Sequence, residues 1–325
     1  MSRFLDFFQS KKAKNKGAED LQIADEVKNS GVLKAFLKDC SVEIMPRSLS
    51  NVKDMKILFP QKTRIYLAHI EGTPFENMLA AAQRLVDDGF TVIPHIPARI
   101  IPDNKTCETW VSCYADIGVK SALLLAGGVT NPCGDFHSSM QLLETELFDK
   151  YNYTHLYIAG HPEGNKDIDP KGSDHQVMEA LQWKQNFANR SDAHFAIATQ
   201  FCFEASGAFE WAKRIKESQI DLPIYIGVAG PTRLKTLLKY AVNCGVGPSI
   251  RVLQKRALDI KNLLVPFSPS KFLDELVVMV DEKKDATNPC SAHFFPLGGI
   301  VETAKWIAFA QGDHTRLERI EFIKQ

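Results

Sequence analysis

The sequence predicts a (β/α)₈ barrel, an α/β fold also called a TIM barrel, with a helical extension at its N-terminus. Eight short apolar runs alternate with helical patterns along the 325 residues. Most of these runs have no polar interruption, as expected for parallel strands that are buried on both faces. Strands separated by helices form right-handed crossovers, and eight such units are typical of this barrel. An open doubly wound sheet is the alternative, but no GxGxxG follows the first strand.

The N-terminal 40 residues are expected to form a polar lead-in and helices that pack on the barrel. Residues 1–20 are rich in lysine and indicate a loose or solvated segment. Between residues 20 and 38, apolar side chains recur at roughly helical spacing and Gly31 interrupts them. This pattern predicts one or two short helices. Residues 41–325 are then expected to form a single barrel domain.

The strands and helices of the barrel follow one another from residue 41 onward. The strands are expected to begin near residues 41, 64, 91, 121, 154, 194, 223 and 291. The helices are expected at 75–88, 106–117, 138–149, 175–188, 208–217, 232–244, 249–265, 269–280 and 300–310. Gly89 and Gly118 follow the first two of these helices, as is typical of helix C-termini.

Charge and cysteine content limit the possible partners. Lys+Arg and Asp+Glu both number 39, so the chain lacks the basic excess that nucleic-acid binding favours. No apolar stretch is long enough to cross a bilayer, and no apolar segment follows the basic N-terminus, so we expect neither a membrane partner nor a secretory signal. The seven cysteines are widely spaced without a CxxC pair. This spacing indicates a reducing, cytoplasmic location.

The first strand carries one carboxylate in an apolar run. Side chains alternate between the two faces of a strand, so Glu43 points away from Val42 and Ile44. It lies either on the surface of an edge strand or in the mouth of a sheet or barrel, and the strands that follow favour the mouth. There it is either paired with Arg47 or Lys53, or a catalytic acid whose pKa is raised by an apolar neighbourhood.

Other polar residues lie where the expected strands end, which is where barrel enzymes collect their functional groups. His95 is either a satisfied core histidine or a donor to a ligand. Gly127 and Gly128 permit a tight turn or the close approach of a flat cofactor or a phosphate. The acids and histidines between residues 161 and 175 lack a convincing metal-ligand spacing, so no metal is expected. Further candidates at strand ends are His69, Glu71, His161, Glu163, Thr199 and Gln200.

Five segments resemble motifs of the methylenetetrahydrofolate reductase family, a set of flavin-dependent (β/α)₈ barrels. The segments are VEIMPR at 42–47, PHI at 94–96, AGHPEGN at 159–165, ATQFCF at 198–203 and IGVAGP at 226–231. They resemble, in the same order, the family's F-E-F-x-P-P-R, P-H-L, A-G-Y-P-E-G-H, I-T-Q-x-x-F/Y and P-G-I-x-P. The resemblance covers residues 41 to about 310, and each segment lies on an expected strand.

The resemblance implies reduction of 5,10-methylenetetrahydrofolate to 5-methyltetrahydrofolate by NAD(P)H through FAD, a reaction of one-carbon metabolism. Glu43 matches the general acid that protonates N10 of the folate, and Gln200 matches the residue that hydrogen-bonds the pterin. A lysine suits a pyrophosphate contact as a point charge. The positions that hold FAD correspond to His95, Ser138, His161, Asn165 and Lys184.

The fourth strand departs from the family's L-R-G-D, whose Arg and Asp lie beside the flavin. The same stretch here is Leu125-Ala126-Gly127-Gly128. Ala126, Gly127 and Gly128 therefore occupy cofactor positions without a functional side chain, and Gly128 also occupies the position of the Asp that orients folate. His161 stands where tyrosine is usual. Loss of an acid beside a flavin can raise its reduction potential.

Two other functions remain open beside the reductase. A folate-dependent methyltransferase or demethylase would use the pterin pocket without flavin and take methyl donors in place of NAD(P)H. A binding or regulatory homologue would bind folate without turnover. Glu43 and Gln200 weigh against the regulatory homologue, and Ala126 with Gly128 weigh against the reductase. A homo-oligomer is compatible with any of them, because the outer helices of barrels commonly pair, but no surface is indicated.

Overall fold

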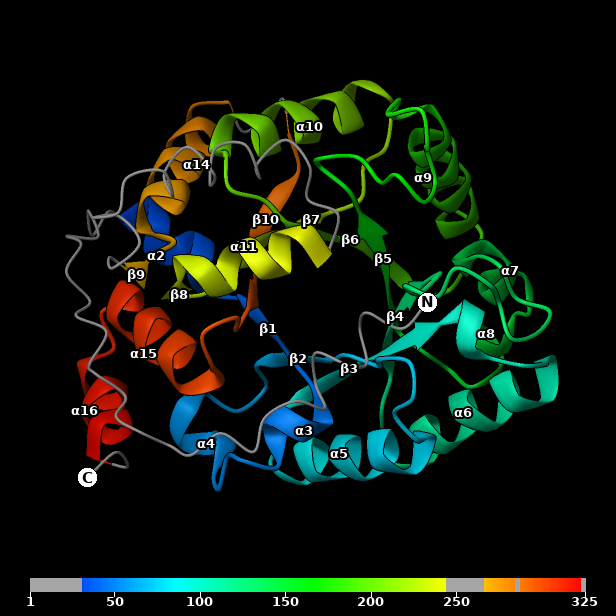
Figure 1. The fold of residues 1–325 in the computed structure, drawn as a ribbon, viewed down its shortest axis with the longest axis horizontal. Helices are drawn as coiled ribbons and strands as arrows, with labels where there is room; N and C mark the ends of the chain where they lie inside the picture. Colours follow the sequence, from blue (N-terminus) through cyan, green and yellow to red (C-terminus); the bar gives the residue numbers. More distant parts are fainter. Residues whose placement is uncertain (1–30, 244–265, 284–286, 323–325) are drawn as a thin grey trace.

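Eight parallel strands close into a barrel, which confirms the predicted fold class (Figure 1). The computed structural model describes residues 31–243, 266–283 and 287–322. Around the barrel the strand order is β1-β10-β7-β6-β5-β4-β3-β2. The strands are β1 (Ser41–Ile44), β2 (Arg64–Leu67), β3 (Thr91–Pro97), β4 (Ser121–Leu125), β5 (His155–Gly160), β6 (His194–Phe201), β7 (Ile224–Ala229) and β10 (Pro289–Phe295).

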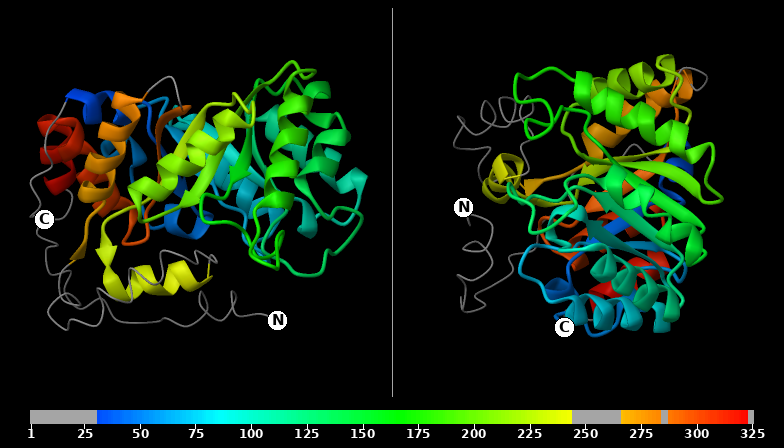
Figure 2. Two further views of the ribbon diagram at one scale, coloured as in Figure 1. Left: turned by 90° about the horizontal axis from the view of Figure 1, so that it is seen from above. Right: turned by 90° about the vertical axis from the view of Figure 1, so that its right-hand side faces the viewer.

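Helices follow the strands and surround the barrel (Figures 1 and 2). The larger ones are α5 (Phe75–Asp87), α6 (Asn104–Asp116), α9 (His175–Ala188), α10 (Ala205–Glu217), α14 (Ser270–Glu282) and α15 (Ile300–Gln311). The shorter ones are α2 (Gly31–Leu37), α3 (Pro46–Leu49), α4 (Met55–Leu58), η1 (Ala98–Ile100), α7 (Ser139–Glu144), α8 (Leu147–Lys150), α11 (Leu234–Asn243) and α16 (His314–Phe322). In the N-terminal extension, α2 packs against α14, α15 and β10.

Several element boundaries differ from those expected. The helix expected at 138–149 is two helices, α7 and α8, because Glu146 has φ of 55°, in the left-handed region that ends a helix. Helix α11 begins two residues late, since Thr232–Arg233 form strand β8, paired antiparallel with β9 (Pro266–Phe267). The short helices α3 and α4 and the closing helix α16 were not expected. The helix expected at 249–265 and the part of the N-terminal helical region before residue 31 lie outside the described residues.

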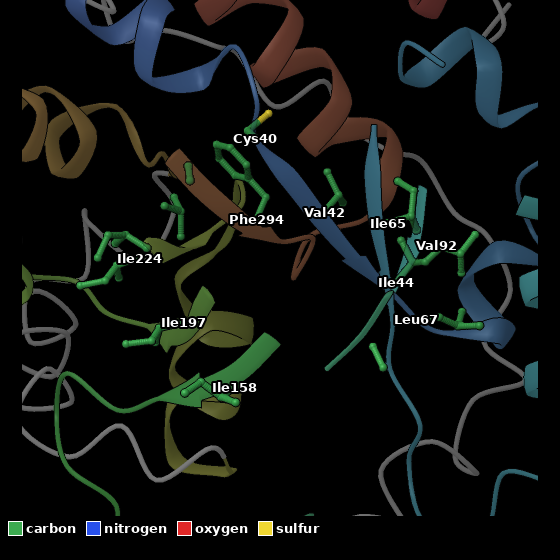
Figure 3. Packing of buried hydrophobic residues seen from close by; sticks show 14 of the residues in the cluster. Cys40, Val42, Ile44, Ile65, Leu67, Val92, Ile158, Ile197, Ile224 and Phe294 are labelled. Atoms are coloured by element: carbon green, nitrogen blue, oxygen red, sulfur yellow. The ribbon is translucent and has the colours of Figure 1, made fainter. Parts of the chain in front are cut away.

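Side chains of the strands alternate between the surrounding helices and the barrel interior. In β1, Val42 and Ile44 pack outward, while Ser41 and Glu43 contact residues of other strands inside the barrel. Burial of each large apolar side chain contributes roughly 1.5–3 kcal/mol, so this outward set holds the helices on the barrel. Figure 3 shows it as Val42, Ile44, Ile65, Leu67, Val92, Ile158, Ile197, Ile224 and Phe294.

Aromatic rings fill the middle of the barrel. Tyr66 on β2 contacts Tyr157 on β5 with ring centroids 5.2 Å apart, and Tyr157 contacts Tyr225 on β7 at 5.8 Å. Neither pair comes from neighbouring strands, so the rings meet across the interior. The interior is therefore a packed core rather than a channel.

None of the helices in the described part of the chain combines the length and the apolarity that a membrane span needs.

Candidate active site

Glu43 lies between two histidines inside the barrel. His95 on β3 places its Nε2 3.3 Å from Glu43 Oε2, and His293 on β10 places its Nε2 3.6 Å from the same oxygen. Strand β2 separates β1 from β3, so the contact with His95 lies on the inner side of the barrel. The Glu43 side chain is 21% exposed and that of His293 is 1% exposed. Glu43 therefore faces the barrel interior and still reaches solvent, and a closed barrel gives β1 no free edge.

Ser41 fixes the proton positions on His293. Its Oγ lies 2.9 Å from Nδ1 of His293, and both residues are buried. An ionised carboxylate only accepts hydrogen bonds, so the His293 nitrogen that faces Glu43 must carry the proton. The Ser41 hydroxyl then donates to Nδ1. Tyr66 packs on the same imidazole, with ring centroids 4.3 Å apart. Ser41, His293 and Glu43 thus form a row of neighbouring polar groups from the core to the partly exposed carboxylate.

The Glu43 carboxyl is ionised at neutral pH in the ligand-free protein. Burial raises its pKa, but the neighbouring rings of His95 and His293 lower it by more, and the balance places the pKa at about 2. Burial lowers the pKa of His293, against the opposing effect of Glu43. Of the two alternatives for Glu43, the raised pKa is thus wrong, because the carboxylate has two imidazole neighbours rather than an apolar surrounding. Any proton that Glu43 donates must first reach it from outside or from a histidine.

Replacing His293 with phenylalanine is expected to lower the free energy of unfolding by roughly 2–4 kcal/mol at pH 7. Phenylalanine keeps an aromatic ring beside Tyr66, but it removes the acceptor for Ser41 and the donor that faces Glu43. Urea denaturation measures the change. Ser41→Ala removes only the hydroxyl and is expected to cost about 1 kcal/mol. An unchanged stability of His293→Phe would contradict this row of polar groups.

Gln200 lies at a bulge near the end of β6. The pairing of β6 with β7 shifts register between Ala198 and Phe201, and Gly227 on β7 approaches this bulge closely. The Gly227 N–H donates to Thr199 Oγ1 at 2.8 Å, and Gln200 Oε1 accepts from the Phe201 N–H at 3.0 Å. The bulge fixes the Gln200 side chain through its oxygen, so its amide nitrogen is the end that remains for a ligand.

Alanine at Gly227 is expected to destabilise the protein by about 1–3 kcal/mol, since overpacking at a close contact forces the backbone to move. The added Cβ would lie 2.5 Å from the Thr199 carbonyl oxygen and 2.6 Å from atoms of the Gln200 backbone. Gly207→Ala in helix α10 is the matched control: its Cβ would meet nothing closer than 3.9 Å. The control is expected to gain up to about 1 kcal/mol. The melting temperatures of the two variants are measured by thermal denaturation. Equal values would mean that the bulge accommodates the added methyl group without cost.

The end of β4 carries backbone and no functional side chain, as the sequence indicated. The Ala126 carbonyl accepts from the Arg99 N–H at 2.9 Å. Gly127 has φ of 96°, a conformation that favours glycine, and its missing Cβ would lie 3.1 Å from Pro97. Nothing lies within 4 Å of the Cβ position of Gly128. The space next to Gly128, beside the barrel mouth, is therefore open.

Arg99 joins the loops that follow β3, β4 and β5. Its guanidinium donates to the Val129 and His137 carbonyls, both at 3.0 Å, and forms an ion pair with Asp167 at 2.6 Å. Asn165 Oδ1 accepts from the Asp167 N–H at 2.9 Å. Two candidate cofactor positions are thereby connected: Asn165 through Asp167, and Ser138, which caps α7 next to His137. An arginine and a carboxylate thus meet near the end of β4, although β4 supplies neither.

Lys184 on α9 is a buried amine that has no counter-charge among the described residues. It is 8% exposed, and within the residues that the structure describes its Nζ has neither a hydrogen bond nor an ion pair. Burial lowers its pKa to about 8, so it is still mainly protonated at neutral pH. Burial and the charge of Lys184 lower the pKa of His161 to about 4. These two candidates lie close enough to interact, and together they form a buried cationic position next to a neutral imidazole.

Three residues of the site were missed by the sequence reasoning. His293 is in the middle of the last strand, in the alternating series Ser291, His293, Phe295, away from the strand end where functional groups are expected. Arg99 follows β3 in a short 3₁₀ helix that no sequence pattern marked. In the sequence, Tyr66 does not differ from an ordinary apolar residue of its strand. Each is identified by its contacts with residues distant in the sequence, and only the alternation of inward positions along the last strand could have indicated His293.

Elsewhere the described residues form no metal-binding group, but they do form a hollow. Among residues 31–243, 266–283 and 287–322, no group of three His, Cys, Asp or Glu side chains is arranged to hold a metal ion. A hollow of about 580 Å³ opens between the loops after β1 and β2 and helix α5. It is lined by Met45, Arg47, Ile70, Asn77 and other residues, but neither Glu43 nor Gln200 is among them. The hollow is therefore not counted in the candidate site.

Comparisons with known proteins add little beyond the fold. The chain matches no protein-family profile. It is similar to the structure of N-acetylneuraminate lyase from Fusobacterium nucleatum, with 11% identity over 83% of this chain and 72% of that chain and a TM-score of 0.39. It is also similar to the intracellular xylanase from Thermoanaerobacterium saccharolyticum, with 10% identity over 82% of this chain and 88% of that chain and a TM-score of 0.41. Likenesses this weak carry no argument about activity.

Proposed function

We propose that this chain is an enzyme that reduces 5,10-methylenetetrahydrofolate to 5-methyltetrahydrofolate with NAD(P)H through bound FAD. The single observation that carries the proposal is the Glu43 carboxylate held between His95 and His293 on the inner side of the barrel. Glu43 is the residue to which the resemblance assigns protonation of the folate, and the two imidazoles are the proton carriers that such a step needs.

Glu43 and its histidines would hold and deliver one proton. The carboxylate is ionised before substrate binds, so protonation of N10 requires Glu43 first to take up a proton, from solvent or from a neighbouring imidazolium, and then to pass it to the substrate. Covering the carboxylate with a pterin would remove its remaining water and favour this transfer, because desolvation disfavours the charged form. Ser41 holds His293 in the tautomer whose Nε2, the nitrogen that faces Glu43, carries the proton.

The residues on the other side of the barrel fit an anionic cofactor. A buried ammonium without a counter-charge is costly, and an anion would pair with it. Within the part of the chain that the structure describes, Lys184 is such a group, and pyrophosphate is such an anion. His161 and the amide of Asn165 would add hydrogen bonds, and the open position at Gly128 leaves room for a flat ring. FAD, when bound and reduced by NAD(P)H, would supply a hydride to the one-carbon unit. The backbone of Ala126 and Gly127 would lie beside it without a side chain.

A folate-dependent methyl transfer without flavin is the second candidate. The observation that favours it is the end of β4, where Gly128 offers no group to orient either ligand. Ser138 gives little help, since it serves as the N-cap of α7. In this alternative Glu43 and Gln200 would still bind a pterin, and Lys184 would pair with an anionic group of a methyl donor.

Product analysis distinguishes the two candidates. The protein is incubated anaerobically with FAD, NADH or NADPH and 5,10-methylenetetrahydrofolate, and the folates are separated by chromatography. The proposal predicts 5-methyltetrahydrofolate in amounts that depend on both FAD and the nicotinamide. Formation of methylated folate from a methyl donor, without FAD and without NAD(P)H, would favour the second candidate. Absence of turnover with either set would overturn both.

A further inference from the structure

The loops after β4 and β5 carry most of the candidate cofactor positions. The β4 loop (residues 126–138) and the β5 loop (residues 161–174) contain no helix or strand of their own. The positions they carry are Ala126, Gly127, Gly128, Ser138, His161 and Asn165. A segment without regular structure has many alternative conformations, and a ligand that needs one of them binds more tightly when that conformation is already held. The contacts that hold these two loops therefore affect cofactor affinity.

Arg99 fixes the β4 loop at four points along its length. Its backbone donates to the Ala126 carbonyl and accepts from the Cys133 N–H, both at 2.9 Å. Its guanidinium donates to the Val129 and His137 carbonyls, both at 3.0 Å. These bonds reach from the first residue of the loop to the last but one. A rigid guanidinium with several N–H donors can hold such separate acceptors at once, whereas a lysine amine offers only a point charge.

Asp167 connects the same guanidinium to the β5 loop. Its carboxylate lies 2.6 Å from Arg99 Nη1, and its own N–H donates to Asn165 Oδ1 at 2.9 Å. The Arg99 side chain is 17% exposed and that of Asp167 is 51% exposed. Two exposed charges would stabilise each other little, but a charge-assisted hydrogen bond to a largely enclosed guanidinium contributes more. The ion pair therefore joins the β5 loop to the β4 loop through Arg99.

We propose that Arg99 is a positioning residue, which holds the β4 and β5 loops in the arrangement that FAD needs, with Asp167 as its partner. This inference rests on the proposed function. Arg99 binds the backbone on both sides of the open space at Gly128, and Asp167 binds the side chain of Asn165. Both act on the cofactor through the loops. Without Arg99 fewer molecules have both loops in place, and the apparent dissociation constant for FAD rises in inverse proportion to that fraction.

Amide hydrogen exchange and FAD titration, both with the full chain, test the inference. In Arg99→Met without FAD, exchange in residues 126–138 and 161–174 is expected to accelerate about tenfold, and the dissociation constant for FAD to rise by a similar factor. Saturating FAD is expected to restore slow exchange and to keep flavin reduction by NAD(P)H within about twofold of the unaltered rate, because bound cofactor then holds the loops. Asp167→Asn, at a half-exposed position that the fold tolerates, is expected to change exchange and affinity about threefold.

Lys150→Met is the matched control, because it removes an exposed ion pair, with Glu108, that joins α8 to α6 and neither loop. It is expected to leave loop exchange and FAD affinity unchanged. Unaltered FAD affinity in both Arg99→Met and Asp167→Asn would overturn the inference and leave the proposed function intact. An equal loss of affinity in Lys150→Met, or faster exchange throughout the barrel in Asp167→Asn, would also overturn it. Failure of the unaltered chain to bind FAD would overturn the inference together with the proposed function.

Discussion

Glu43→Gln is expected to slow formation of 5-methyltetrahydrofolate by about 10²–10⁴-fold, the usual contribution of a positioned acid. Glutamine has nearly the same shape, so the substitution keeps the packing of β1 but can neither accept a proton from His95 or His293 nor pass one on. Reduction of bound FAD by NAD(P)H involves no proton from Glu43 and is expected to remain within about twofold. Anaerobic stopped-flow absorbance follows the two half-reactions separately.

Glu71→Gln is the matched control for this variant. Glu71 follows β2 and is exposed, and it does not contact the histidines that hold Glu43. The control is expected to leave both half-reactions unchanged. If Glu43→Gln slowed both half-reactions equally while remaining folded, Glu43 would be a structural residue and the assigned role would be wrong. If Glu71→Gln slowed formation of 5-methyltetrahydrofolate as much as Glu43→Gln does, the effect would not be specific to Glu43 and the assigned role would again be wrong.

Lys184→Met is expected to change stability and cofactor affinity in opposite directions. Methionine fills a similar volume without a charge, so the ligand-free protein is expected to gain on the order of 1–3 kcal/mol of unfolding free energy at pH 7. Affinity for FAD is expected to fall by about 100-fold, because the anion loses the buried cation that would pair with it. Urea denaturation and FAD titration measure the two effects. Lys305→Met is the control, since Lys305 is equally buried but lies 4.0 Å from Glu321.

The gain in stability expected for Lys184→Met depends on pH in a direction that follows from the Lys184 pKa. Lys184 has a pKa of about 8 in the folded protein, below the ordinary value of 10.5. Between these values the unfolded chain binds more protons than the folded one, so stability from this group rises as pH increases from about 8 to 10.5. The destabilisation that comes from burying the charged Lys184 amine is fully present below about pH 8. The gain of Lys184→Met should therefore shrink as pH rises through this window. A gain that is constant across the window would contradict a buried, charged Lys184.

Glu43 and His95 show how much of the site a sequence can reveal. Each interrupts an apolar strand, and the closed barrel brings them to 3.3 Å because parallel strands direct alternate side chains inward. The barrel itself was predictable for the same reason, since eight buried strands separated by helices have few other solutions. The approximate position of Lys184 followed only from the resemblance, and its lack of a counter-charge needed the structure.

The remaining features depend on contacts between distant parts of the chain. The pKa of Glu43 has the opposite direction from that expected, because His293 lies 250 residues along the chain and no local pattern pairs them. Arg99 and Asp167 meet only through the adjacency of the loops after β3, β4 and β5. The break between α7 and α8 depends on the backbone of Glu146, a residue with no strong preference for the left-handed region. Local sequence carries none of these facts.

The visible absorption spectrum of the protein loaded with FAD tests the central claim most directly. Under anaerobic conditions NADH or NADPH should bleach the flavin band, and 5,10-methylenetetrahydrofolate should then restore it, with Glu43→Gln bleaching normally and failing to recover. That result would support a reductase in which the carboxylate between His95 and His293 supplies the proton. A protein that stays colourless after incubation with FAD, or a flavin band that methylenetetrahydrofolate does not restore in the unaltered protein, would contradict it.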